Sequence, residues 1–226
     1  VQVRFFGLDT PALPQTPRFA KSLDLSLATA GNVMVAYEMN GAPLPLLNGY
    51  PLRLVVPGYY GTYWVKMLSD IEVLDHIDDN YWMKTAYRVP ADPCGCMTPG
   101  AKVPTVPISR LTVRSFITNL TDGQTVDGGK RQVVRGIAFD SGYGIQSVLF
   151  SSDGGAHWIP SELGPDDGGR YSFREWSASF DTVSSQQYAL QSLAINTIGE
   201  AQRSTPVWNA SGYLRNAIET VRVTAS

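Results

Sequence analysis

Short runs of alternating or β-branched apolar residues dominate the pattern of hydrophobic and polar positions along this chain. Most runs are closed by Gly, Pro, Asn or Asp, a pattern that is typical of strands joined by turns. In the first part of the chain the pattern predicts strands at residues 1–6, 32–39, 52–58 and 65–75. It also predicts one short helix at residues 22–30, SLDLSLATA, with Ser22 as its N-cap.

The pattern changes at residues 87–109, YRVPADPCGCMTPGAKVPTVPIS, where proline and glycine recur and no periodic apolar face can be drawn. Such a segment is typical of a linker or of a long crossing over the surface. We therefore expect a first domain at residues 1–90, a proline-rich crossing at 91–109 and a second domain at 110–226.

Strand alternation is cleaner in the second domain. Turn signals such as SDGG (152–155) and TDGQ (121–124) separate the apolar runs. Short strands spaced in this way favour an immunoglobulin-like sandwich of two sheets. The predicted strands are residues 131–139, 145–152, 156–163, 171–180, 187–196 and 216–224.

Two finer predictions concern this second domain. The stretch IQSVLFSSDGGAHW is expected to form a hairpin closed by Asp153, Gly154 and Gly155, because positive φ costs glycine little. Trp158 and Trp176 lie on predicted strands, and their rings suit the space between two sheets. We therefore expect both tryptophans in the core.

Composition and charge exclude some functions. A chain of 226 residues with 43% hydrophobic content can form a sizeable core. The net charge is -2 and no basic run exceeds Lys130–Arg131, so we expect no nucleic-acid partner. No stretch approaches the ~18 apolar residues of a membrane helix, and VQVRFFGLDT lacks the order of a signal peptide. We expect a soluble chain with no export signal within it.

Common catalytic motifs do not occur. The sequence contains no G-x-G-x-x-G, G-x-x-x-x-G-K-[ST], G-x-S-x-G or H-E-x-x-H. No nucleophile motif accompanies His76 or His157, so we expect both histidines at the surface. The acidic pairs Asp78–Asp79 and Asp166–Asp167 are interpreted as solvated turn residues.

The two cysteines, Cys94 and Cys96, form a C-x-C pair in the proline-rich crossing. A zinc site needs about four ligands, and both histidines are distant in sequence, so a metal site has weak support. Exposed thiols in a flexible loop and a disulfide link between the two cysteines are the alternatives. Neither decides the redox compartment.

Two cations, Arg53 and Lys66, lie in the otherwise apolar and turn-rich stretch NGYPLRLVVPGYYGTYWVK, residues 48–66. A buried guanidinium is costly unless it meets an anion, and its planar fork matches a phosphate or a carboxylate. The two cations flank a glycine turn and together could hold the anion of a ligand. Alternatively, Arg53 pairs with an internal acid such as Glu38 or Glu72, and Lys66 extends to solvent.

Four segments of the chain carry a specific resemblance: FFGLD (5–9), VMVAYEMNGAPLPLLNGYPLRLVVPGYYGTYWVKMLSDIEVLD (33–75), YWMKTAYRVP (81–90) and VWNASGYLRNAIETVRV (207–223). Together they resemble the sulfite oxidase family of molybdenum enzymes. Within that family the resemblance is strongest to bacterial periplasmic sulfite dehydrogenases, which pass electrons to a cytochrome c. The resemblance implies an α+β molybdopterin-binding domain, mostly strands and loops, followed by an all-β immunoglobulin-like dimerisation domain.

The resemblance also assigns roles to single residues. Arg53 and Lys66 match the basic residues that hold the phosphate end of molybdopterin. Asn48 stands where the family often has histidine, and its amide can donate a hydrogen bond but carries no charge. Tyr87 matches the active-site tyrosine whose hydroxyl faces the metal-oxo group and the substrate. Ser211 stands where animal members have arginine, which implies a bacterial-type pocket or a different anion.

The molybdenum-ligating cysteine of the family precedes the segment that resembles FFGLD, and Cys94 and Cys96 do not match it. We therefore expect residues 1–90 to be the C-terminal half of the cofactor domain, with its N-terminal half as a partner outside this chain. The resemblance implies oxidation of sulfite to sulfate in a periplasmic homodimer, dimerised through residues 110–226, with a cytochrome c as electron acceptor. The chain alone is expected to be inactive. Alternatives are a family member that acts on another sulfur or sulfoxide substrate, and a cofactor-free dimerisation or assembly module.

Overall fold

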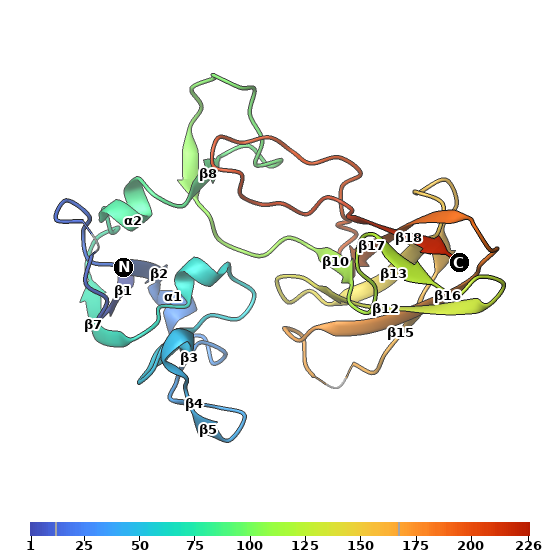
Figure 1. Cartoon of the computed structure of the whole chain (residues 1–226). Coiled ribbons are helices and arrows are strands. Elements are labelled where there is room, and N and C mark those ends of the chain that lie inside the picture. Colours follow the sequence, from blue (N-terminus) through green and yellow to red (C-terminus); the bar gives the residue numbers. More distant parts are fainter. Residues whose placement is uncertain (12, 167) are drawn as a thin grey trace. The chain divides into compact units, whose positions relative to one another are not determined.

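The computed structural model describes residues 1–11, 13–166 and 168–226. It contains two compact units, whose elements are labelled in Figure 1. The first unit comprises Val1–Arg110 together with Trp208–Tyr213, and the second comprises Leu111–Val207 and Leu214–Ser226. The chain thus returns to the first unit late in the sequence, and Trp208–Tyr213 is called the return segment below.

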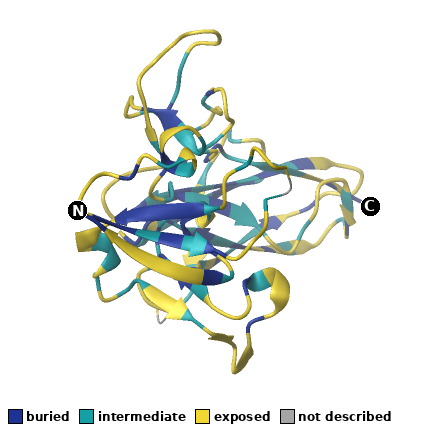
Figure 2. Cartoon of the chain, turned by 90° about the vertical axis from the view of Figure 1, so that its left-hand side faces the viewer, coloured by how far each residue is buried: buried dark blue, intermediate teal, exposed yellow. Residues whose placement is uncertain are grey.

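A three-stranded antiparallel sheet forms the centre of the first unit. Strand β1 (Gln2–Gly7) lies between β2 (Ala20–Asp24) and β7 (Leu68–Leu74). In Figure 2, β1 and β2 are largely buried, whereas β7 exposes its middle residues. Strands β1 and β2 therefore contribute apolar side chains to the core of this unit, and Leu54, Val56 and Val65 add to it from the following segments.

The helix predicted at residues 22–30 is mostly wrong. Ser22 does not cap a helix, because it is buried in β2 and pairs in register with Arg4 of β1. Helix α1 occupies only Leu25–Ala28, and its N-cap residue is Asp24. Pairing with β1 outweighs the weak local helix preference of this segment.

The remaining elements of the first unit are short. Strand β3 pairs with β6, β4 pairs with β5, and β8 pairs with β9, all antiparallel. The proline-rich segment therefore contains a strand, β9, within the first unit. The bounds are β3 (Met34–Ala36), β4 (Glu38–Met39), β5 (Ala42–Pro43), η1 (Leu46–Asn48), β6 (Arg53–Val55), η2 (Gly61–Tyr63), α2 (Tyr81–Lys84), β8 (Arg88–Pro90) and β9 (Thr105–Pro107).

Two sheets form the second unit. One has the strand order β10-β12-β16-β15 and the other has the order β11-β18-β17-β13-β14. The bounds are β10 (Arg114–Ile117), β11 (Gln124–Val126), β12 (Arg131–Phe139), β13 (Ile145–Ser151), β14 (Ile159–Pro160), β15 (Glu162–Leu163), β16 (Arg174–Asp181), β17 (Gln187–Asn196) and β18 (Thr220–Ala225).

Both sheets contribute to one hydrophobic core. On β17 every second residue is buried, including Tyr188, Leu190 and Ala194, which is the period of a strand with one inward face. Trp176 is only 2% exposed, so its prediction as a core residue is confirmed. The prediction is wrong for Trp158, which is half-buried and lies beside Gly155.

The strand predictions for the second unit are largely confirmed. Strands β12 and β17 have the predicted bounds. Strands β13 and β14 form a hairpin, but β14 begins only at Ile159, so the connection is longer than the predicted turn at Asp153, Gly154 and Gly155. The predicted strand at 156–163 is divided into β14 and β15, which belong to different sheets.

The interpretation of Asp78 as a solvated residue is wrong. Asp78 is buried and accepts hydrogen bonds from Arg4 Nη2 at 2.6 Å and Arg4 Nε at 2.7 Å, and also from Ser22 and Asn80. Asp79 is exposed as predicted. Asp166 is an exposed partner of Arg174, whereas Asp167 lies outside the described residues.

Both histidines lie at the surface, as predicted. The Nδ1 atom of His76 lies 2.7 Å from a carboxylate oxygen of Asp75. The Nδ1 atom of His157 lies 2.6 Å from a carboxylate oxygen of Asp153.

Candidate functional site

Backbone pairing brings the segments of Arg53 and Lys66 together. The N–H of Leu54 donates to the carbonyl of Val65 at 2.9 Å, and the N–H of Leu68 donates to that of Leu52 at 2.8 Å. Gly49 permits the backbone of its segment to lie close to Lys66. It has a φ of 110°, and a Cβ at this position would lie 3.0 Å from the Cβ of Lys66.

The two cations bind neighbouring main-chain carbonyls of η1. Nη1 of Arg53 donates to the carbonyl of Asn48 at 3.0 Å, and Nζ of Lys66 donates to the carbonyl of Leu47 at 2.6 Å. The structure thus places Asn48, Arg53 and Lys66 in one cluster.

Of the alternative interpretation, the pairing of Arg53 with an internal acid is wrong, whereas Lys66 is exposed to solvent as expected. Glu72 pairs instead with Arg4, at 3.1 Å. Within the described part of the chain, neither Arg53 nor Lys66 forms an ion pair. The charge of this cluster is therefore not balanced by a carboxylate in direct contact with it.

The guanidinium of Arg53 retains a donor that the protein does not use. Its Nε is buried and has no hydrogen-bond partner, and its Cζ lies 5.4 Å from the ring centroid of Trp64. Burial lowers the pKa of Arg53, because it disfavours the charged form. An unsatisfied, desolvated guanidinium is the group that an anionic ligand would stabilise. The cluster accordingly fits a phosphate or a carboxylate.

A cavity of about 430 Å³ places Tyr87 beside these residues. Lys66 and Tyr87 share its wall, with Trp64 linking the cavity to Arg53. Thr62 also lines it, and the buried hydroxyl of this residue has no partner. The other lining residues are Asp9, Phe19, Gly61 and Met67.

Tyr87 follows directly after the turn that ends α2. Asn80 caps α2, with its side-chain oxygen accepting from the N–H of Trp82 at 2.8 Å. Tyr87 itself has a φ of 54°, an unusual backbone conformation for a bulky residue. Its ring packs edge-on against Phe19 at 6.4 Å between centroids and stacks on Tyr213 at 6.0 Å. The ring is therefore held on two sides.

Tyr213 comes from the return segment. Asn209, which is buried, fixes this segment by donating to the carbonyl of Tyr213 at 2.8 Å and accepting from its N–H at 3.1 Å. Burial raises the pKa of Tyr213, and the nearby Tyr87 adds to the effect. Ser211 is exposed and lines a different cavity, of about 350 Å³, together with Asn209.

A buried lysine also lies against Tyr87. Lys21 of β2 is 0% exposed, and its Nζ donates to the carbonyl of Trp82 at 2.7 Å. The same Nζ lies 4.8 Å from the ring centroid of Tyr63 and 5.1 Å from that of Tyr87. Burial lowers the pKa of Lys21 to about 8, with a smaller contribution from Arg88. Sequence reasoning missed this residue, because RFAKSLD does not read as an apolar strand.

The largest cavity described, of about 550 Å³, contains none of the predicted site residues. Its wall combines Asp24, Asp78 and Asp79 with Lys84 and Arg88. This mixed charge offers less to an anion than the Arg53–Lys66 cluster does.

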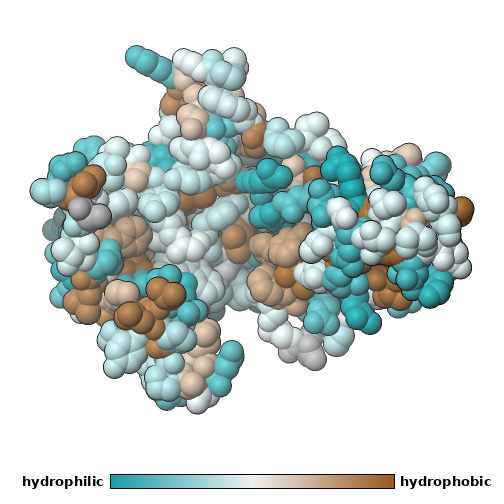
Figure 3. All heavy atoms as spheres, in the orientation of Figure 1, coloured by the Kyte–Doolittle hydropathy of each residue, from teal (hydrophilic) through white to brown (hydrophobic). Residues whose placement is uncertain are grey.

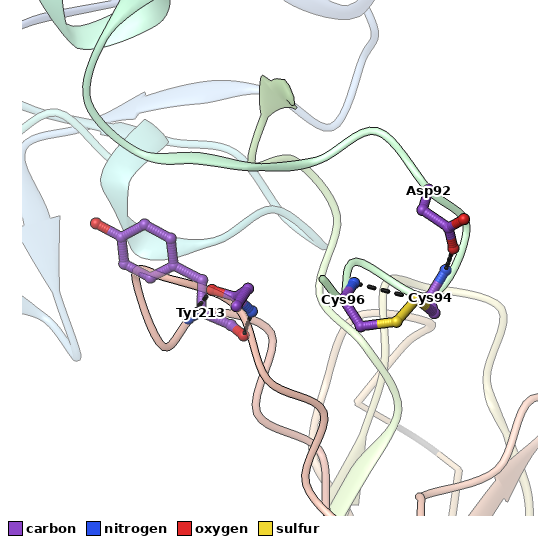
Figure 4. The surroundings of a disulfide bond; sticks show 5 residues. Asp92, Cys94, Cys96 and Tyr213 are labelled. Carbon is purple, nitrogen blue, oxygen red and sulfur yellow. Dashed lines mark hydrogen bonds between the residues drawn. A yellow bond between two sulfur atoms is a disulfide. The ribbon is translucent and has the colours of Figure 1, made fainter. Parts of the chain in front are cut away.

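Cys94 and Cys96 form a disulfide (Figure 4), so the second of the two alternatives is confirmed and that of free thiols is wrong. Asp92, Cys94 and Cys96 place one potential ligand atom each within 4.8 Å of one another. Both sulfurs are engaged in the disulfide, which excludes them as thiolate ligands in this state. In the described residues, no helix is long and apolar enough to span a membrane.

Residues 1–82 match the protein family described as the oxidoreductase molybdopterin binding domain. The mitochondrial sulfite oxidase of Rattus norvegicus is 32% identical over 98% of this chain and 41% of the rat protein. The sulfite oxidase of Arabidopsis thaliana is 27% identical over 95% of this chain and 58% of the plant protein. The chain thus spans about two fifths of the rat relative's length and more than half of the plant relative's.

The fold is similar to that of the sulfane dehydrogenase SoxCD from Paracoccus pantotrophus. The TM-score is 0.82, and the alignment covers 99% of this chain and 55% of that one at 23% identity. The similarity extends across both units.

Proposed function

Because this chain belongs to the sulfite oxidase family of molybdenum enzymes, we propose that it supplies part of a molybdenum-dependent sulfite dehydrogenase. The reaction is the oxidation of sulfite to sulfate, with electrons passed to a cytochrome c. The observation that carries the proposal is the Arg53–Lys66 cluster, which has no carboxylate partner in the described chain and lies beside the cavity of Tyr87.

Each residue of the cluster has a role in this proposal. Arg53 and Lys66 hold the phosphate end of molybdopterin, and Asn48 supports them through the carbonyl that orients Arg53. The hydroxyl of Tyr87 donates a hydrogen bond to sulfite and orients it. When bound, the molybdenum cofactor supplies the two-electron redox chemistry. The cysteine that ligates the metal belongs to the rest of the cofactor domain.

Exposed apolar residues support the N-terminal half of the cofactor domain as a partner of the first unit. Ile71 and Val73 on β7 are 57% and 72% exposed, and Leu46 and Leu47 on η1 are 65% and 82% exposed. Figure 3 shows hydrophobic side chains on the face of the first unit that it presents. Exposed apolar residues on a strand edge favour a covering partner. We propose that the N-terminal half of the cofactor domain packs here.

For the second unit, Leu111–Val207 and Leu214–Ser226, we propose an immunoglobulin-like sandwich that dimerises the enzyme. Its two sheets and shared core support the architecture. We also propose a periplasmic location. The Cys94–Cys96 disulfide is compatible with an oxidising compartment but does not decide the location.

A different sulfur or sulfoxide substrate is the second candidate. Ser211 favours it, because this position offers no positive charge to a sulfite oxyanion. Kinetics with sulfite against sulfane-sulfur and sulfoxide substrates distinguishes the two candidates. A cofactor-free assembly module is the third, and it predicts a purified complex without molybdenum or pterin.

The test uses the chain combined with the rest of its cofactor domain. We expect molybdenum and oxidised-pterin fluorescence in stoichiometric amounts, and sulfite-dependent reduction of cytochrome c. Arg53→Gln and Lys66→Met should lose most of the pterin, whereas Tyr87→Phe should retain pterin and lose turnover. Arg131→Gln and Lys130→Met are matched controls, because both cations are exposed in the second unit. Equal pterin content in site and control variants, or activity of the isolated chain, would contradict the proposal.

A further inference from the structure

The Cys94–Cys96 disulfide has no part in the proposed function. It closes a ring across Gly95 alone. A disulfide stabilises a fold mainly by restricting the unfolded chain, and the effect is smallest for the shortest loops. A link between residues two apart therefore contributes little to the stability of the first unit. Its chemistry is the remaining reason to examine it.

The surroundings distinguish the two sulfurs, although the Asp92 carboxylate lies within 4.8 Å of both and disfavours a thiolate on either. Both cysteines are half-buried, so a small reagent can reach them. The N–H of Cys96 lies 3.1 Å from Sγ of Cys94 and donates to it, and the N–H of Cys94 donates to Asp92 at 2.9 Å (Figure 4). A donor at Cys94 Sγ stabilises a thiolate there. Because a stabilised thiolate leaves faster, Cys96 is the sulfur that is attacked and Cys94 is the sulfur that leaves.

We propose that Cys94–Cys96 is a redox site that exchanges with a dithiol reductant. One thiolate of the reductant attacks Sγ of Cys96, the Cys94–Cys96 bond breaks, and its electron pair leaves on Cys94. The second thiolate of the reductant then attacks the reductant's other sulfur, which is bonded to Cys96 in the mixed disulfide, and Cys96 is released. The protein gains two electrons, the reductant becomes a disulfide, and its two thiol protons pass to the cysteine sulfurs.

The site is connected to the wall that holds Tyr87. The N–H of Met97, the residue after Cys96, donates to the carbonyl of Trp208 at 2.9 Å. Trp208 begins the return segment, whose Tyr213 stacks on Tyr87. Opening the disulfide removes the constraint on the chain next to Met97. The return segment is therefore the part of the first unit whose environment we expect to change when the disulfide is reduced.

Alkylation of the folded chain tests the exchange. The 226-residue protein is equilibrated in buffers with graded ratios of reduced to oxidised dithiothreitol, quenched in acid, alkylated and mapped by mass spectrometry. We expect both cysteines to become fully alkylated together while far-ultraviolet circular dichroism remains that of the folded protein. Cysteines that stay unmodified until denaturant is added would overturn the proposal. Cys94→Ser and Cys96→Ser should show no such paired transition.

Glutathione, a monothiol, tests which sulfur is attacked. We expect the trapped mixed disulfide on Cys96, with Cys94 alkylated in the same molecules. Glutathione found on Cys94 would overturn the assignment of Cys94 as the leaving sulfur.

Tryptophan emission tests the connection to the return segment. We expect reduction to shift the emission of the parent and of Trp158→Phe, a control in the second unit, and not that of Trp208→Phe. An unchanged emission in the reduced parent would overturn the connection. These measurements need neither cofactor nor turnover, so they hold whatever reaction the complete enzyme performs.

Discussion

The ammonium of Lys21 lies 5.1 Å from the ring centroid of Tyr87, in a position from which solvent is excluded. It donates hydrogen bonds to the carbonyl of Trp82 and to the sulfur of Met83. Aromatic faces stabilise a buried cation, but burial still disfavours the charge, as the lowered pKa shows. This pair connects the stability of the first unit to the ring of the candidate active-site tyrosine.

The first prediction concerns the pH dependence of stability. The pKa of Lys21 is about 8 in the folded chain and about 10.5 in the unfolded chain. Between these values the unfolded chain holds a proton that the folded chain has released, so the free energy of unfolding rises with pH. The expected gain is about 1 kcal/mol per pH unit from about pH 8 to pH 10. Lys21→Met should abolish this rise in urea unfolding curves.

Tyr63 sets the upper limit of the pH range in which the free energy of unfolding rises. Burial raises the pKa of Tyr63, so above pH 10 the folded chain holds a proton that the unfolded chain loses, and stability falls. Lys84→Met, which removes an exposed lysine, is the control and should retain the rise. A flat stability profile between pH 8 and 10 in the parent would contradict the prediction.

Asp78 is expected to be a major electrostatic determinant of the first unit. Burial acts to raise its pKa, but hydrogen bonds from Arg4, Ser22 and Asn80 outweigh it and hold the pKa well below its usual value. Asp78→Asn leaves Arg4 without its closest counter-charge and should cost about 3 kcal/mol at pH 7. Asp79→Asn is the matched control, because Asp79 is exposed, and should change the free energy of unfolding by less than about 0.5 kcal/mol.

The same carboxylate predicts acid sensitivity. Since its folded pKa is depressed, its contribution is complete above the unfolded pKa of about 4 and is lost as pH falls below that value. Urea unfolding at pH 7 and at pH 3 should show a smaller difference for Asp78→Asn than for the parent. Equal differences would exclude Asp78 as a cause of acid destabilisation.

Arg53 should bind anions even without cofactor. Its buried Nε lacks a partner, so an anion that reaches it stabilises the folded chain by mass action. Inorganic phosphate should raise the melting temperature of the parent more than chloride at equal ionic strength. Arg53→Met should lose this increment, and Arg131→Met should retain it. An increment that survives in Arg53→Met would place the anion elsewhere.

Gly136 is expected to tolerate no side chain in the second unit. A Cβ at this position would overlap the ring of Trp176 and the carbonyl of Phe116. Gly136→Ala should therefore destabilise the second unit by about 2–3 kcal/mol, measured by thermal or urea unfolding. Gly31→Ala is the control, since its Cβ would meet nothing within 4 Å. Destabilisation of both variants to the same extent would show that the overlap is not the cause.

The sequence predicted the second unit better than the first. Strand β17 alternates buried and accessible residues along its whole length, so its hydrophobic pattern predicts where the strand begins and ends. Around Ser22 the leucines fit a helix equally well, and the choice of a strand depends on pairing with β1. The local pattern of a single sequence does not show that pairing.

Distance along the chain explains what was missed at the site. Asp78 looked like a turn residue, because its partner Arg4 lies 74 residues away. Residue chemistry alone left two interpretations of Arg53 open, and only the three-dimensional contacts excluded its pairing with Glu72. The stacking of Tyr213 on Tyr87 joins positions separated by the second unit, and no local pattern signals it.

The return segment has a consequence for the order in which the molecule is made. Trp208–Tyr213 leaves the ribosome after strands β1 to β17 have been synthesised. Tyr87 thus has no stacking partner while most of the chain is already present. The pocket of the first unit is thus completed only after strands β1 to β17 have been made, and a chain truncated at Arg110 would keep both cations of the cluster but lack this aromatic wall.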